Sequence, residues 1–200
     1  MAVGDSWTVS LAYPTAGPGQ SGITVKSWAE HFAEMSGSEC TIIARGGRTT
    51  KAFIDTGSSG DYGEAVADTS DYAILYLGIN DITAITAQSP TETIEQFITY
   101  YTQIVNDLLT NHKFVFCLNI PKAGHTSSGR GTVNAAIASV CESVTGAYLV
   151  DLTNVPDTIT SLSANGHLSS VGYAAFAEMV AEGISKAMES NSYFATGIDQ

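Results

Sequence analysis

Residues 72–81, Tyr-Ala-Ile-Leu-Tyr-Leu-Gly-Ile-Asn-Asp, decide the fold. The first six form a near-continuous apolar run, which is typical of a parallel strand that is covered on both faces. Gly78 follows at once, and Asn80 and Asp81 come two and three residues later, so the strand leads directly into a polar loop. This segment predicts a central strand of an α/β sheet with polar side chains at its carboxyl end, where such folds bind their ligands.

Strands and helices alternate on both sides of this segment. Apolar runs predict further strands over residues 40–44, 114–118 and 147–151, and residues 1–3 can form only the end of a strand. Helical periodicity appears in four segments, 25–35, 91–111, 133–144 and 171–188. We expect loops over residues 13–22, 56–63 and 121–131. The alternation predicts a flavodoxin-like α/β fold, a three-layer α/β/α sandwich with about five mostly parallel strands.

Length and composition set bounds on the class of protein. Two hundred residues suit one domain, and a hydrophobic content of 44% with 14% charged residues is typical of a globular chain. We therefore expect a single domain over residues 1–200. The net charge of −12, with only eight Lys and Arg, argues against binding to nucleic acid or to anionic membranes.

The sequence says little about the compartment. No stretch approaches the ~20 apolar residues that cross a bilayer, and no signal peptide is visible. Because the first strand is so short, we expect either a piece of a longer protein or a mature form without its leader. The three cysteines make no disulfide framework, and we expect Cys40 and Cys117 to be buried as small hydrophobes. No Cys and His cluster has the spacing of a zinc site.

Polar residues follow three of the predicted strands. Ser6 follows the first, Gly46-Gly47 the second and Asn80 the third, while His167 precedes the last helix. Because parallel strands end at the same edge of a sheet, these residues should converge there. A serine, a loop glycine, an asparagine amide and a histidine are the groups that acyl transfer through a serine nucleophile requires.

In these segments the chain resembles the SGNH hydrolases, the superfamily of GDSL-type esterases and lipases. The similar blocks occur in the family's order: Gly4-Asp5-Ser6, Gly47-Arg48-Thr49-Thr50, Gly78-Ile79-Asn80-Asp81, and His167 with Leu168, Gly172 and Tyr173. Each block alone is a weak signal. Together, at strand ends of a compatible fold, they cover essentially the whole chain and make the resemblance specific.

The resemblance implies a role for each residue. Ser6 would be the nucleophile, and His167 would be the general base and then the acid on the leaving group. The Ser6 and Gly47 N–H groups and the Asn80 amide would form the oxyanion hole. Without the other blocks, Ser6, Gly47 and Asn80 would be read as ordinary cap or turn residues. We expect Asp5 to bond the N–H groups of its own loop.

One part of the family pattern is missing. The family places Asp three residues before the histidine, and here that position is Ala164. In serine proteases the triad Asp fixes the imidazole tautomer, and its loss costs ~10⁴ in rate. Three interpretations remain open: a Ser–His dyad oriented by a backbone carbonyl or Asn165, an inactive or binding-only derivative, and an engineered substitution. Asp151 and Asp157 are further acidic residues that could replace the missing one.

These observations favour a serine esterase that needs no metal or organic cofactor. We expect a small acyl group, acetyl above all, on a carbohydrate or another polar carrier, because no long apolar lid is evident. The alternatives are a lipase or thioesterase of the same family, and a catalytically impaired binding or structural module of a phage tail or surface protein.

Overall fold

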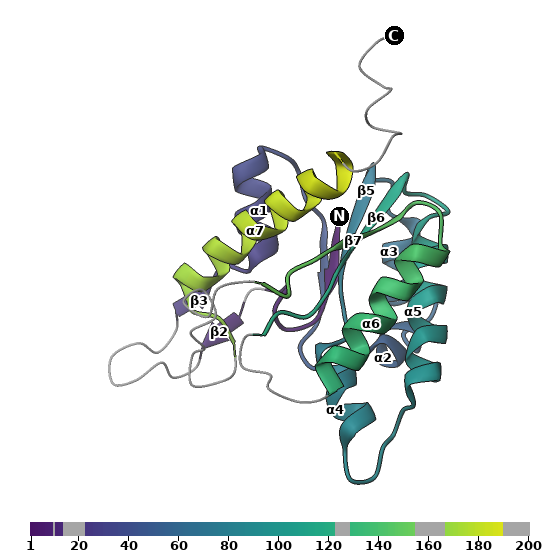
Figure 1. Cartoon of the computed structure of the whole chain (residues 1–200). Coiled ribbons are helices and arrows are strands. Elements are labelled where there is room, and N and C mark those ends of the chain that lie inside the picture. The colour runs from purple at the N-terminus through teal and green to yellow at the C-terminus, as the bar shows by residue number, and fades with distance from the viewer. Residues whose placement is uncertain (10, 14–22, 123–128, 155–166, 190–200) are drawn as a thin grey trace.

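The computed structural model describes the chain apart from residues 10, 14–22, 123–128, 155–166 and 190–200 (Figure 1). Its central sheet has five strands, which lie in the spatial order β4 (Ile42–Ala44), β1 (Ala2–Gly4), β5 (Tyr72–Tyr76), β6 (Phe114–Leu118) and β7 (Ala147–Val150). All neighbouring pairs are parallel. Numbered within this sheet alone, the strands run 2-1-3-4-5, which is the flavodoxin-like order. The predicted α/β class is therefore confirmed.

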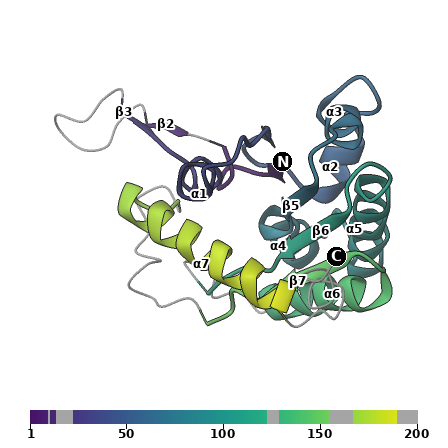
Figure 2. The ribbon, with the colours of Figure 1, turned by 90° about the horizontal axis from the view of Figure 1, so that it is seen from above.

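Helices cover both faces of the sheet. They are α1 (Trp28–Ser36), α2 (Thr50–Ile54), α3 (Asp61–Ala67), α4 (Ile79–Thr86), α5 (Ile94–Leu108), α6 (Gly129–Ser143) and α7 (Ser170–Glu189). Figure 2 shows α1 and α7 side by side on one face, with α2 to α6 on the other. This is the expected three-layer sandwich. In the part of the chain that the structure describes, no helix is long and apolar enough to cross a membrane.

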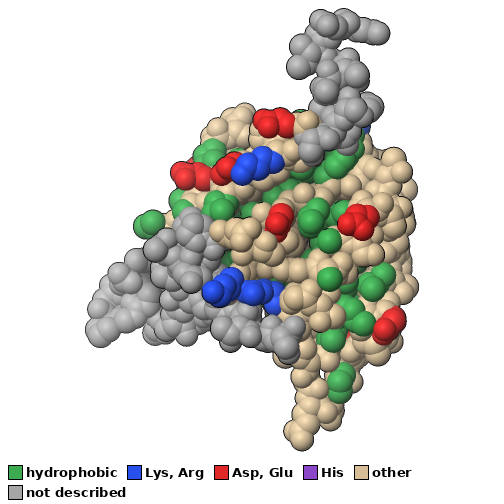
Figure 3. Space-filling view, in the orientation of Figure 1, with side chains coloured by type: hydrophobic (Ala, Val, Ile, Leu, Met, Phe, Trp, Pro, Cys, Tyr) green, Lys and Arg blue, Asp and Glu red, His purple; other side chains and the backbone are tan. Residues whose placement is uncertain are grey.

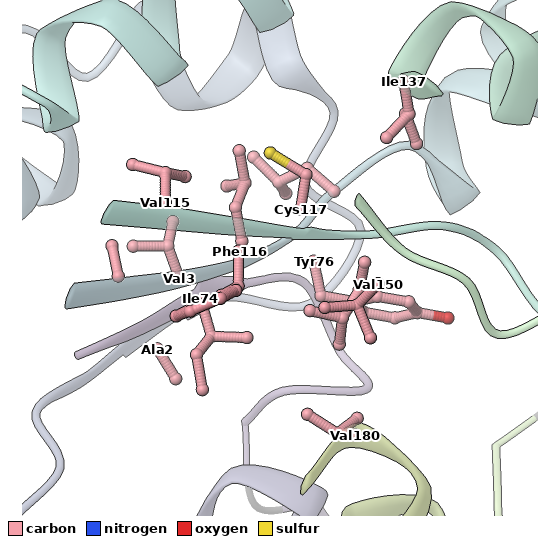
Figure 4. Close-up of a cluster of buried hydrophobic side chains, with 14 of the residues drawn as sticks. Ala2, Val3, Ile74, Tyr76, Val115, Phe116, Cys117, Ile137, Val150 and Val180 are labelled. Atoms are coloured by element: carbon pink, nitrogen blue, oxygen red, sulfur yellow. The ribbon is translucent and has the colours of Figure 1, made fainter. Parts of the chain in front are cut away.

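The two central strands explain why the sheet is buried on both sides. Four of the five residues of β5 and of β6 are buried, as their apolar runs predict. Figure 4 shows their side chains between Ile137 of α6 on one face and Val180 of α7 on the other. Cys117 belongs to this core and is buried, as expected, whereas Cys40 is only half-buried.

Capping residues determine where two helices begin, which the apolar periodicity did not predict correctly. Ser27 begins α1 with a capping box, in which Ser27 N donates to Glu30 Oε2 (2.7 Å) and Glu30 N to Ser27 Oγ (3.4 Å). Thr93 and Gln96 make the same arrangement at α5, so this helix begins at Ile94 and not at residue 91.

Some short elements differ from the prediction. An antiparallel hairpin of β2 (Leu11–Tyr13) and β3 (Ile23–Val25) flanks the segment that was expected to be a loop. Residue 25 therefore ends a strand and does not begin a helix. The helices α2 and α4 lie directly after strands, and α3 begins inside the predicted 56–63 loop. Helices of five to eight residues carry too few apolar positions for a clear period.

Candidate active site

Three of the predicted site residues, Ser6, Gly47 and Asn80, come shortly after the ends of adjacent strands. β1 lies between β4 and β5, and Gly4 is in register with Ala44 on one side and with Tyr76 on the other. The chain leaves all three strands at the same edge, so Ser6, Gly47 and Asn80 follow strand ends that are neighbours in space. His167 comes from the segment just before α7.

Ser6 lies in a tight turn that begins at Asp5. The carbonyl of Asp5 accepts hydrogen bonds from Thr8 N (3.0 Å) and Val9 N (3.2 Å). Trp7 is almost completely buried, and its ring packs against Tyr76 and Phe176 with both centroid separations at 6.0 Å. Trp7 therefore anchors the turn in the core, while Ser6 itself remains half-exposed.

The structure brings Ser6 and His167 into hydrogen-bond contact. Ser6 Oγ lies 2.8 Å from His167 Nε2, across 161 residues of sequence. This distance lies within the hydrogen-bond reach that a serine nucleophile and its base would require. An imidazole nitrogen that accepts from the hydroxyl could remove its proton as the hydroxyl attacks a carbonyl carbon.

The glycine block, here Gly46 and Gly47, lies directly beside Ser6. A Cβ atom on Gly46 would stand 3.7 Å from Ser6 Cβ, in ordinary van der Waals contact. Gly47 has a φ of 72°, in the left-handed region, and an added Cβ would meet no atom within 4 Å. Backbone conformation, not lack of space, is therefore the reason for glycine at position 47.

Asn80 lies in the first turn of α4 and connects the three strand-end segments. Its Nδ2 donates to the carbonyl oxygen of Arg48 (3.0 Å) and to Asp5 Oδ2 (3.3 Å). Both partners are acceptors, which fixes the nitrogen end of the amide on this side. The amide thus faces the turn of Ser6 and the loop of Gly46 and Gly47.

Asp5 is completely buried beneath this site. Its Oδ1 accepts from Trp7 N (2.9 Å), as predicted for a residue that bonds its own loop. The bond from Asn80 was not predicted, because nothing in sequence spacing links positions 75 residues apart. Burial raises the pKa of Asp5 to about 8; the nearby charge of Asp81 also raises it, while the Trp7 N–H bond opposes the shift.

A second buried carboxyl ties the other two segments together. Asp81 Oδ1 accepts from Thr50 N (2.9 Å) and from Thr50 Oγ1 (2.6 Å), which joins the start of α2 to the start of α4. Burial raises the pKa of Asp81. Glu92, a residue that sequence reasoning missed, is also buried, and its pKa is raised to about 7 by burial and by the charge of Asp81.

Of the acidic and neighbouring positions considered for orienting His167, Ala164, Asn165 and Asp157 lie outside the described residues. Asp151 is described, and its Oδ1 accepts from Asn119 Nδ2 (2.8 Å), Thr153 N (3.0 Å) and Thr153 Oγ1 (2.7 Å). Its carboxylate is thus engaged at the end of β7.

Comparison with solved structures supports this fold. A family two carbohydrate esterase from Cellvibrio japonicus matches with a TM-score of 0.70 and 17% identity, over 94% of this chain and 60% of the other. The family two carbohydrate esterase from Clostridium thermocellum, solved with cellohexaose, has a TM-score of 0.67 and 18% identity, over 92% of this chain and 63% of the other. Axe2, an acetylxylan esterase from Geobacillus stearothermophilus, has a TM-score of 0.64 and 13% identity, over 92% of both chains. This chain therefore spans less than two thirds of the two family two esterases but nearly the whole of Axe2.

Comparison of sequences gives the family. A search of curated protein sequences found no match. The model of the GDSL-like lipase/acylhydrolase family, in contrast, matches residues 2–175, which include Ser6, Gly47, Asn80 and His167. This match covers most of the 200 residues. The chain belongs to the GDSL-like lipase/acylhydrolase family, within the SGNH hydrolases.

Proposed function

We propose that this protein is a serine esterase that hydrolyses small acyl esters, acetyl esters above all, on a carbohydrate or another polar carrier. The observation that carries the proposal is the 2.8 Å contact between Ser6 Oγ and His167 Nε2. A serine hydroxyl bonded to an imidazole at a sheet edge is the arrangement that nucleophilic acyl transfer needs.

The reaction proceeds in two halves. Ser6 Oγ attacks the ester carbonyl carbon while His167 takes the hydroxyl proton, and a tetrahedral oxyanion forms. The C–O bond to the carrier then breaks, and the imidazolium gives its proton to the departing alcohol. Water then attacks the acyl-enzyme while the same imidazole takes its proton. The bond from the acyl carbon to Ser6 Oγ breaks, Oγ takes the proton back from the imidazolium, and the carboxylic acid leaves. No metal or organic cofactor takes part.

The oxyanion is held by three donors: the N–H groups of Ser6 and Gly47 and the side-chain amide of Asn80. Support for Asn80 comes from its location, since its amide joins the Gly47 segment to the Ser6 segment through bonds to the Arg48 carbonyl and Asp5 Oδ2. The left-handed backbone at Gly47 and the closeness of Gly46 to Ser6 support the part of the glycine block. Loss of one such donor typically costs ~10²–10³ in rate.

A carbohydrate ester is the preferred substrate class. Solved structures with this fold include proteins described as carbohydrate esterases, one of them with a bound cello-oligosaccharide. The chain carries a net charge of −12, which suits neutral carriers better than polyanions. On the face shown in Figure 3, basic side chains are few and lie among acidic and apolar ones, which is unlike a nucleic-acid surface.

The competing function is that of a catalytically impaired module that binds a ligand or serves as a structural domain of a larger protein. Its specific support is Ala164, which stands where the family has Asp. A Ser–His dyad would still turn over slowly, whereas an impaired module would not turn over at all.

Hydrolysis of p-nitrophenyl acetate by the wild type, Ser6→Ala and Ser36→Ala decides between them. Ser36 is a matched control, because it is an exposed serine whose hydroxyl donates to Ala33 O (3.2 Å) at the end of α1. We expect Ser6→Ala to abolish the enzymatic rate and Ser36→Ala to retain it. Equal rates for the wild type and Ser6→Ala would refute the esterase. Acetylated xylo-oligosaccharides and p-nitrophenyl octanoate then test the substrate class, since a preference for the octanoate would favour a lipase.

A further inference from the structure

Asp5 makes contacts that its own turn does not require. Its two carboxylate oxygens serve different segments: Oδ1 accepts from Trp7 N at 2.9 Å, and Oδ2 accepts from Asn80 Nδ2 at 3.3 Å. The first bond closes the turn of the nucleophile. The second reaches a side chain on α4, and a residue that only shaped its turn would not need it.

The Asn80 amide is held at both of its N–H groups. The Arg48 carbonyl lies 3.0 Å from Nδ2, and Asp5 Oδ2 lies 3.3 Å from the same atom. A distance of 3.3 Å is long for a bond to a carboxylate. That N–H can therefore be shared with a third acceptor that arrives beside Ser6, such as an oxyanion, while the Arg48 bond keeps the amide plane in place.

We propose that Asp5 is a positioning residue for the reaction, which orients the Asn80 amide toward the oxyanion through its Oδ2 atom. This inference rests on the proposed esterase function. Asp5 touches no reacting atom itself and acts on the rate only through Asn80.

Both groups that contact the Asp5 side chain, Trp7 N and Asn80 Nδ2, are N–H donors, so position 5 must offer an acceptor to each of them. Above pH 8, where Asp5 is ionised, Asp5→Asn keeps the shape but replaces a carboxylate oxygen, which only accepts, with an NH₂ group, which only donates. The Trp7 N–H belongs to the backbone of a closed turn and keeps the remaining oxygen. The new NH₂ then faces Asn80 Nδ2, donor against donor, and drives the amide out of its place.

A double-mutant cycle at pH 9, where Asp5 is ionised, tests this coupling in the whole chain with p-nitrophenyl acetate. Asn80→Ala should lower kcat by ~10²–10³ with little change in KM, because the oxyanion exists only in the transition state. Asp5→Asn should lower kcat about tenfold to a hundredfold, also at constant KM. In Asp5→Asn/Asn80→Ala the second change should add no further loss beyond about threefold. Losses that multiply would overturn the proposal.

Asp68→Asn is the matched control for the loss of a carboxylate. Asp68 also accepts from the backbone N–H two residues on (Ser70, 2.8 Å) and contacts a side-chain nitrogen at 3.3 Å (His112 Nε2), but it precedes β5 at the opposite edge of the sheet. We expect kcat to be retained in Asp68→Asn. A loss equal to that of Asp5→Asn would overturn the proposal, because it would show a general effect on folding.

A measurement without substrate covers the case in which a variant does not fold or the chain has no esterase activity. The side-chain amide ¹⁵N–¹H signals of Asn80 should move as the neighbouring Asp5 ionises, with a midpoint near its pKa of about 8. Asn134, whose Nδ2 donates to Ile120 O (2.9 Å), supplies a reference amide that should stay constant. An Asn80 signal that does not move between pH 6 and 9.5 would overturn the positioning role. Equal rates for the wild type and Ser6→Ala would instead refute the esterase alone.

Discussion

Raising the pH from 5 to 7 should destabilise the protein through Asp5. An exposed Asp in the unfolded chain has a pKa of about 3.9, whereas burial raises the pKa of Asp5 in the folded protein to about 8. Between these values the folded state keeps a proton that the unfolded state has lost. The free energy of unfolding therefore falls as the pH rises through this window, and the contribution is constant below about 4 and above about 8.

The magnitude follows from the width of the window. One pH unit inside it changes the free energy of unfolding by about 1.4 kcal/mol for a group that is protonated only in the folded state. From pH 5 to pH 7 the contribution of Asp5 is therefore about 2–3 kcal/mol, a large part of the ~5–15 kcal/mol of a typical domain. Glu92, with its pKa raised to about 7, changes stability in the same direction, so the wild type alone does not isolate Asp5.

Urea denaturation of the wild type and Asp5→Asn at pH 5, 6 and 7 isolates the contribution of Asp5 to stability, because Asn cannot ionise. Trp7 and Trp28, both buried, report unfolding by fluorescence. The difference in free energy between the two proteins should shrink by about 2–3 kcal/mol from pH 5 to pH 7. Asp68→Asn should show no such change, because the pKa of Asp68 is lowered and its contribution lies below this window. If the free energies of unfolding of the wild type and Asp5→Asn changed equally with pH, Asp5 would not be a buried carboxyl that stays protonated in the folded state.

Substitutions at three further positions test the surroundings of the site. Gly4→Ala should destabilise the protein by about 1–3 kcal/mol in urea denaturation, because its Cβ would lie 2.0 Å from Oγ1 of the buried Thr8; an unchanged midpoint would show that Thr8 can move away. Thr50→Val should lower stability by about 1–3 kcal/mol, since it removes the hydroxyl that donates to Asp81, and Thr50→Ser should retain most of it. Ala164→Asp should raise kcat for p-nitrophenyl acetate, and an unchanged kcat would show that another group already orients the imidazole.

The sheet was predictable from the sequence because its central strands are apolar on both faces. The runs at 72–77 and 114–118 correspond to β5 and β6 within one residue. The short helices α2 and α4 were not predicted, since they are set by single residues. Thr49 caps α2 through a bond from Ala52 N (3.1 Å), and Gly78 permits the turn into α4 with a φ of 125°. Such local bonds leave no periodic pattern.

The candidate site was predictable in its parts but not in its connections. The residue types and their places after strands follow from the sequence, because parallel strands end at one edge. The bonds from Asn80 to Asp5 and to Arg48, and from Thr50 to Asp81, join residues 31 to 75 positions apart. No spacing rule predicts such pairs, since they depend on the order of β4, β1 and β5 in the sheet.

The position of His167 relative to Ser6 depends on packing that the motifs do not contain. The bonds from Asn80 to Asp5 and Arg48, and from Thr50 to Asp81, lie among the segments that follow β4, β1 and β5, so these segments form one packed unit. His167 comes from the segment before α7 instead, and α7 meets that unit where Phe176 packs edge-on against Trp7 at 6.0 Å. Trp7 is the residue after Ser6, so this buried ring links the turn of Ser6 to the helix that follows His167. The aromatic core therefore connects the two segments that bring Ser6 and His167 together.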